Sequence, residues 1–208
     1  MVRGLEVGKR ATLLISECQN GIVNRAFVNS PLSAEVEARG ILPKIDRFAD
    51  SFRAAGLPVV HCTITLPRDL SGWNANCVIA ARLLKEARLV TGTPFAAIDD
   101  RIRVDEADVV VERHHGMSPF TGTMLDAHLR RLRIDTVVLS GVSSNIALPG
   151  AATEAVGLGY NVILAEDCVA GGTAETHAMQ VAMHFPLIAT VSDAASVTAA
   201  LTSRQVPA

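Results

Sequence analysis

Aromatic residues and cysteines are scarce in this chain of 208 residues. Phe, Trp and Tyr together make up 4%, with a single Trp and a single Tyr, and only four cysteines are present. The cysteines form no C-x-x-C pair, and their wide spacing fits no metal motif. Scarcity of cysteine therefore excludes a disulfide scaffold and a thiolate metal centre.

Charge of one sign and long apolar runs are also lacking. The net charge is −2, which excludes the strong field that attracts nucleic acid or an acidic membrane. No apolar run approaches the ~18 residues of a membrane-spanning helix, and the opening MVRGLEVGKR has no apolar signal core. We therefore expect a cytoplasmic protein whose partner is a small molecule.

Apolar residues, in contrast, are abundant. They make up 49% of the chain, which is enough for one domain over residues 1–208 with a large core. Apolar runs alternate with helical patterns, which predicts a single-domain α/β fold: an open parallel sheet of about six strands with helices on both faces. The expected strands lie at 11–16, 58–63, 108–111, 136–140, 161–165 and 188–191.

The longest connection, 66–104, contains Pro67, Gly72 and Pro94 and one helical stretch near 78–87. No repeat or second-domain linker accompanies it. We interpret this connection as a segment that caps the functional site.

Polar residues follow several of the expected strands. Glu17, Arg113 and the turn 143–147 all stand at carboxyl ends, as does Cys62. Ligands of open parallel sheets bind beyond those ends. A carboxylate such as Glu17 must be paired or functional, because a lone buried charge is costly. Arg113 is a fixed charge that can clamp an anion, and the two residues could equally form a structural ion pair.

Three segments resemble the isochorismatase-like (cysteine) hydrolase family. Gly141–Ala147, GVSSNIA, is similar to its active-site turn G-V-x-T-x-x-C, and residues 13–20 are similar to a first strand ending in I-D-x-Q-N. Residues 112–123 are similar to the segment that carries the family lysine and ends in S-x-F-x-G-T. The resemblance runs from about residue 11 to residue 192 and implies hydrolysis of a small molecule, no cofactor, and a homo-oligomer (dimer or tetramer).

Matched residue by residue, the family triad Asp, Lys, Cys falls on Glu17, Arg113 and Ala147. The resemblance thus implies these three as catalytic positions, but the nucleophile is replaced by a methyl group. It also implies a cis peptide before Ser143. Asn145 and the N–H groups of Ile146 and Ala147 remain able to bind an oxyanion.

The remaining candidates have two interpretations each. His114 and His115 supply a base or pack against the loop. Cys62 is a displaced nucleophile or a small buried residue, since free cysteines are often buried. Ser143 or Ser144 is a nucleophile or an ordinary turn residue.

Trp73 and Phe120 close the site over a ring or fill the core. No metal is expected, because 61–64, His-Cys-Thr-Ile, lacks the D-x-H metal pattern of the nicotinamidase branch.

Three functions stay open. The first is hydrolysis without a covalent step, of the vinyl-ether type, with Glu17 as the acid and Arg113 as the anion clamp. The second is a catalytically degenerate relative that serves as a binding or assembly subunit. The third is an amidohydrolase that uses Cys62 or a turn serine.

Overall fold

Six parallel strands form one sheet in the computed structural model, which describes residues 2–203. Their order is β3-β2-β1-β4-β5-β6, so the expected domain is described for all but residues 1 and 204–208. The strands are β1 (Ala11–Ser16), β2 (Val59–Ile64), β3 (Val109–Arg113), β4 (Thr136–Val142), β5 (Asn161–Ala170) and β6 (Thr190–Ser192).

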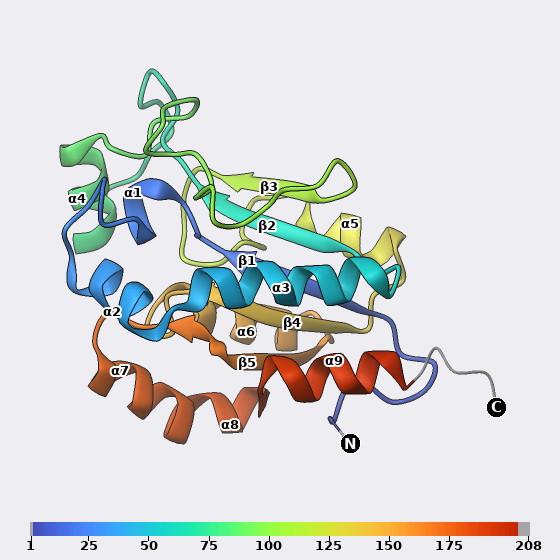
Figure 1. Ribbon diagram of the computed structural model, residues 1–208. Helices are drawn as coiled ribbons and strands as arrows, with labels where there is room; N and C mark the ends of the chain where they lie inside the picture. The colour runs from blue at the N-terminus through green and yellow to red at the C-terminus, as the bar shows by residue number, and fades with distance from the viewer. Residues whose placement is uncertain (1, 204–208) are drawn as a thin grey trace.

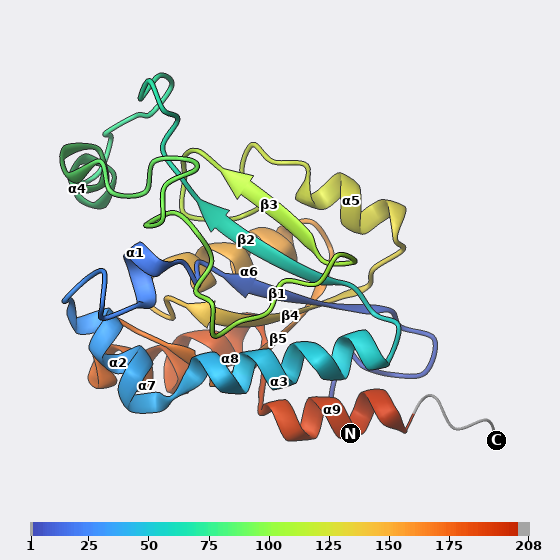
Figure 2. The same cartoon turned by 45° about the horizontal axis from the view of Figure 1, so that its top comes forward.

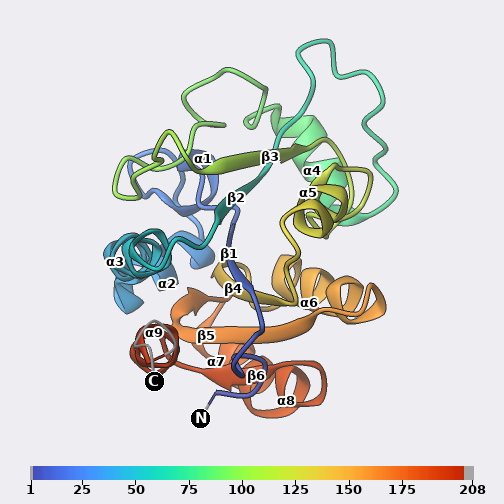
Figure 3. The same cartoon turned by 90° about the vertical axis from the view of Figure 1, so that its right-hand side faces the viewer.

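Two helical layers cover the sheet, as Figure 3 shows edge-on. One face packs against α2 (Pro31–Arg39), α3 (Ile41–Ala54) and α9 (Ala194–Thr202), and the other against α5 (Leu125–Arg131), α6 (Ala147–Gly157) and α8 (Phe185–Ile188). Strand residues alternate between the two cores: Leu13 and Ile15 enter the first, Leu14 the second. The expected doubly covered α/β sheet is confirmed.

Three further helices lie outside these layers. They are α1 (Asn20–Val23), α4 (Val78–Glu86) and α7 (Ala174–Met179), and α7 continues into the π-helical turn η1 (Gln180–His184). The connection between β2 and β3 runs past the carboxyl ends of the strands and carries α4 at the same end of the sheet as α1 (Figures 1 and 2). Among the described residues, no helix is long and apolar enough to cross a membrane.

The last two strands differ from the sequence-based boundaries. The expected strand 188–191 begins only at Thr190, because Ile188 ends helix α8. The expected strand 161–165 continues to Ala170, and the register with β4 shifts between Leu139 and Gly141. The irregularity carries β5 forward alongside the turn that follows β4.

The sheet order reverses direction between β1 and β4. Gly141 of β4 has φ +92°, and a Cβ placed there would lie 2.3 Å from the carbonyl oxygen of Ser16. Only glycine permits this close approach of the two strand ends. In open α/β sheets ligands bind at such a reversal, so the residues after β1 and β4 define where the site should lie.

Candidate functional site

Glu17 is the first residue after β1 and has an unusual backbone. Its φ is +52°, in the left-handed region that non-glycine residues rarely occupy. Hydrogen bonds hold it there: its N–H donates to Cys62 O at 2.8 Å, and its carbonyl accepts from Gln19 N at 2.8 Å. Backbone of this kind recurs at functional sites, where surrounding structure enforces it. The bend aims the Glu17 side chain away from the strand and toward β3.

Arg113, the last residue of β3, donates from Nη2 to the Glu17 carboxylate. The side chains are 2% and 14% exposed, respectively. Arg113 Nε donates to Gly116 O at 3.4 Å, while its buried Nη1 has no hydrogen-bond partner among the described residues. The expected meeting of Glu17 and Arg113 is confirmed as geometry, and the guanidinium retains unused hydrogen-bonding capacity.

The turn after β4 lies on the other side of the reversal. The Val142–Ser143 peptide is cis, as the resemblance implied. The carbonyl of Ser143 accepts from the N–H groups of Ile146 and Leu148 at 3.2 and 3.1 Å, and α6 begins at Ala147. Asn145 Oδ1 accepts from Gly172 N at 2.9 Å, which ties the turn to the loop after β5.

A series of hydrogen-bonded polar side chains connects this turn to β5 and α2. Ser144 Oγ lies 3.2 Å from His177 Nδ1, and His177 Nε2 lies 2.9 Å from Glu166 Oε1. Arg39 donates to the same carboxylate oxygen at 2.5 Å. Burial alone would raise the pKa of Glu166, but hydrogen bonds from His177 and Arg39 lower it. The negative end of the series is therefore fixed, and the network holds the turn in place.

Ser144 is not placed as a nucleophile by this network. It is fully buried, and a Cβ on Gly171 would meet its Oγ at 2.5 Å. No room remains beside the hydroxyl for a substrate carbonyl. The contact between Ser144, His177 and Glu166 instead serves to position the turn.

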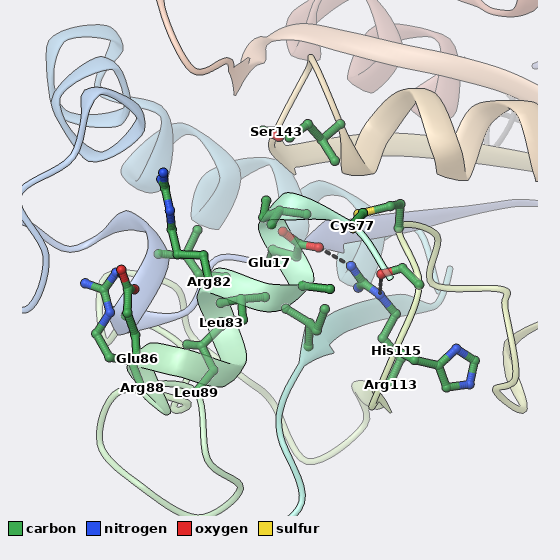
Figure 4. A pocket seen from close by; sticks show the side chains of 18 of the residues that line it. Glu17, Cys77, Arg82, Leu83, Glu86, Arg88, Leu89, Arg113, His115 and Ser143 are labelled. Atoms are coloured by element: carbon green, nitrogen blue, oxygen red, sulfur yellow. Dashed lines mark hydrogen bonds and ion pairs between the residues drawn. The ribbon is translucent and has the colours of Figure 1, made fainter. Parts of the chain in front are cut away.

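The Glu17–Arg113 pair borders a cavity of about 910 Å³ beneath the cap, shown from close by in Figure 4. Seven of the residues expected at the site line it: Glu17, Trp73, Arg113, His115, Ser143, Asn145 and Ile146. The structure thus brings together both sides of the sheet reversal and the aromatic residue of the cap.

Five expected site residues do not line this cavity. Ala147 is buried at the start of α6. Phe120 is 5% exposed and stacks on Tyr160 at 6.1 Å between ring centroids. His114 turns to Thr65, with Nδ1 3.2 Å from its carbonyl oxygen. Cys62 and Ser144 are also buried, so all five occupy the core or the loops around the cavity.

The buried thiols are poor nucleophiles. Burial raises the pKa of Cys62 to about 12, with Arg113 partly opposing the shift, and burial likewise raises the pKa of Cys168 to about 12. Burial also raises the pKa of Cys18. A thiolate, not a thiol, attacks substrate. Cys62 therefore remains protonated and enclosed, which removes the structural support for it as a displaced nucleophile.

Sequence reasoning missed much of the cavity wall. Cys77 at the start of α4, Leu83 within it and Leu89 beyond it all line the cavity, as do residues of α1 and α2. The helical pattern near 78–87 was the available signal, but it could not reveal which face of the helix lines the cavity.

Among residues 2–203, no group of three or more His, Cys, Asp and Glu side chains gathers in a way that would hold a metal ion.

Comparison with known proteins agrees with this geometry. The isochorismatase domain family matches residues 11–196. The chain is 30% identical to the uncharacterized isochorismatase family protein YecD of Escherichia coli O157:H7, over 90% of this chain and 94% of that protein. It is 28% identical to N-carbamoylsarcosine amidase of Arthrobacter, over 62% and 49%.

An isochorismatase family protein of Desulfovibrio vulgaris superposes with a TM-score of 0.82 at 23% identity, covering 94% of this chain and all of that one (100%). Since the family match contains all six strands and both sides of the sheet reversal, the chain belongs to the isochorismatase family and is a hydrolase-like protein of that fold.

Proposed function

We propose that this protein hydrolyses a small anionic molecule without a covalent step, in the manner of vinyl-ether cleavage. Arg113 holds a carboxylate of the substrate, and Glu17 delivers the proton. The observation that carries the proposal is the buried Arg113 guanidinium, which pairs with Glu17 at the cavity and whose Nη1 has no partner within residues 2–203.

The ion pair places the proposed proton donor beside the proposed anion site. A substrate carboxylate shares the guanidinium of Arg113 with the carboxyl group of Glu17. In the proposed reaction Glu17 acts in its carboxylic acid form, as the general acid.

The chemical step then needs no nucleophilic side chain. The proton of Glu17 moves to the terminal carbon of the C=C–O unit, which leaves an oxocarbenium ion. Water adds to that cation, and the resulting hemiketal breaks into a ketone and an alcohol while the proton returns to Glu17. The absence of a thiol at Ala147 is compatible with this route, because nothing has to form a bond to the enzyme.

Turnover of 2-phenoxyacrylate tests the proposal. This vinyl-ether carboxylate yields pyruvate and phenol, and pyruvate is measured with lactate dehydrogenase. Glu17→Gln should lower kcat by roughly 10²–10⁴-fold, the usual contribution of a general acid, while the affinity for substrate persists. Cys62→Ala should retain turnover and serves as the control.

Contrary results separate the other two functions. Full activity of Glu17→Gln would remove Glu17 as the acid. A thiol-sensitive hydrolysis of an amide that is lost in Cys62→Ala would favour the amidohydrolase. Binding without turnover in the unmodified protein would favour the degenerate binding subunit, which the methyl group at Ala147 also permits.

We also propose that the protein is cytoplasmic and forms a homo-oligomer. Light scattering coupled to size-exclusion chromatography measures the oligomeric state directly.

A further inference from the structure

The cavity is far larger than the polar corner that holds Glu17 and Arg113. Its volume of about 910 Å³ lies near the upper end of ~300–1,000 Å³ for sites that enclose drug-sized ligands. A carboxylate and a vinyl ether would occupy a small part of it. The remaining wall of the cavity therefore contacts either the rest of the substrate or water.

That remaining wall is mainly apolar, and it also contains Arg82 and the ion pair between Glu86 and Arg88. From the cap it receives Trp73, Ile79, Leu83 and Leu89, and from α1 and the segment that enters α2 it receives Ile22, Val28 and Leu32. The indole N–H of Trp73 already donates to Ala80 O at 2.9 Å, so it offers the cavity no donor. Figure 4 shows Leu83 and Leu89 near Glu86 and Arg88, with the Glu17–Arg113 pair to the right of them.

The end of the cavity that contains Glu17 and Arg113 is suited to binding an anion. The Arg113 side chain is 2% exposed, and its Nη1 has no partner among the described residues. A carboxylate can accept two parallel hydrogen bonds from one guanidinium. The cavity therefore has an anion-binding corner at the sheet and an apolar chamber under the cap.

We propose that the substrate is an amphipathic carboxylate, whose anionic end binds Arg113 and whose apolar body fills the chamber between α4 and the α1–α2 segment. This inference rests on the proposed function for the role of Arg113 and adds the class of substrate. The apolar body supplies affinity, and the carboxylate sets the orientation.

A series of straight-chain acids tests the chamber by binding alone. Acetate, butyrate, hexanoate and octanoate are titrated calorimetrically into the full-length protein. Burial of each methylene should tighten Kd roughly fourfold, until the chamber is filled. The matching alcohols should bind more weakly than the acids, by roughly tenfold or more, because they lack the charge that Arg113 selects. Affinity independent of chain length would overturn the proposal.

Paired variants on one helix locate the chamber. Leu83 lines the cavity, whereas Val78 on the same helix is 80% exposed and does not line it. Leu83→Asn should reduce the gain in affinity per methylene to less than twofold, and Val78→Asn should leave the gain at the wild-type value. Equal effects of the two substitutions would contradict the proposed position.

Arg113→Met separates the two ends of the ligand. It should abolish the preference for acids over alcohols and preserve the dependence on chain length. Thermal unfolding checks that each variant is folded. These binding measurements need no turnover, so their outcome does not depend on the Glu17→Gln result. If affinity depends on chain length but no turnover is observed, the proposed ligand class is supported and only the role of Glu17 as the acid is removed.

Discussion

At the scale of single residues, Glu17 and Arg113 are unequal partners. The arginine side chain is 2% exposed and the glutamate side chain 14%, because the latter borders the cavity. A charge left alone in the interior is costly, whereas one that reaches water is tolerated. The difference in exposure predicts that the pair will respond asymmetrically to substitution.

Glu17→Ala should destabilise the fold by about 3 kcal/mol or more, because it leaves a buried guanidinium without its anion. Arg113→Met should cost clearly less, because the carboxylate that remains lies at the cavity. The double variant should recover much of the loss of Glu17→Ala. Urea unfolding of the four proteins measures these free energies, and equal losses for the single variants would contradict the burial argument.

The positive φ of Glu17 is a second residue-scale feature. Left-handed backbone costs an L-residue ~1–2 kcal/mol, and no sequence pattern distinguishes a glutamate that adopts it. The sequence could predict that Glu17 and Arg113 stand at strand ends, because apolar runs end beside them. Their direct contact, 96 residues apart in the chain, could be expected only from the sheet order.

At the scale of secondary-structure elements, buried strands were the most predictable part of the fold. The strand expected at residues 11–16 is confirmed, and all six of its residues are buried. The region 185–191 was harder. Its short apolar stretch is compatible with either a strand or a helix, and Phe185–Ile188 is helical.

The contact of Ser144 with His177 was beyond prediction from sequence. The two residues are 33 positions apart and meet because β5 extends past its irregularity. Long-range contacts of this kind depend on how elements pack, which local periodicity does not encode.

Helix α4 places a reactive side chain at the cavity. Cys77 is the exposed one of the four cysteines and lines the cavity. N-ethylmaleimide should therefore form one adduct per native chain and weaken octanoate binding by roughly tenfold, because the added bulk overfills the site. Mass spectrometry and calorimetry measure the two effects.

Cys77→Ala supplies the matched control for this prediction. It should bind octanoate normally and resist the reagent. An adduct that left octanoate affinity unchanged would place Cys77 outside the route by which ligand enters.

At the scale of the whole molecule, buried titratable pairs set the response to pH. His61 lies 3.0 Å from Asp108, and both side chains are 2% exposed. Burial lowers the pKa of His61, against the opposing effect of Asp108. Burial alone would raise the pKa of Asp108, but hydrogen bonds from Arg53 and His61 lower it.

The sign of the His61 effect follows from linkage. Its folded-state pKa lies below the unfolded value of ~6.5, so the unfolded chain binds more protons in that window. Stability is complete above ~6.5 and declines as the pH falls toward the folded-state pKa. The Asp108 contribution is present above its unfolded pKa of ~3.9 and is lost as the pH falls through the lower, folded-state value.

Thermal unfolding at pH 7.5 and 5.5 tests this assignment. The wild-type Tm should fall between these values, and His61→Gln, which keeps a donor for Asp108, should show a smaller fall. An identical fall in both proteins would assign the pH dependence to other groups.

The part of the cap that carries α4 begins and ends at neighbouring positions. Leu66 N donates to Leu89 O at 2.8 Å, and Thr91 N donates to Leu66 O at 2.9 Å, so the chain leaves and rejoins the domain through one short bridge. Within α4 itself, only Ala80 is buried. The segment between is thus an exchangeable module: another sequence of different length could be grafted between these anchors, altering what the cavity admits while the sheet and its Glu17–Arg113 pair keep their positions.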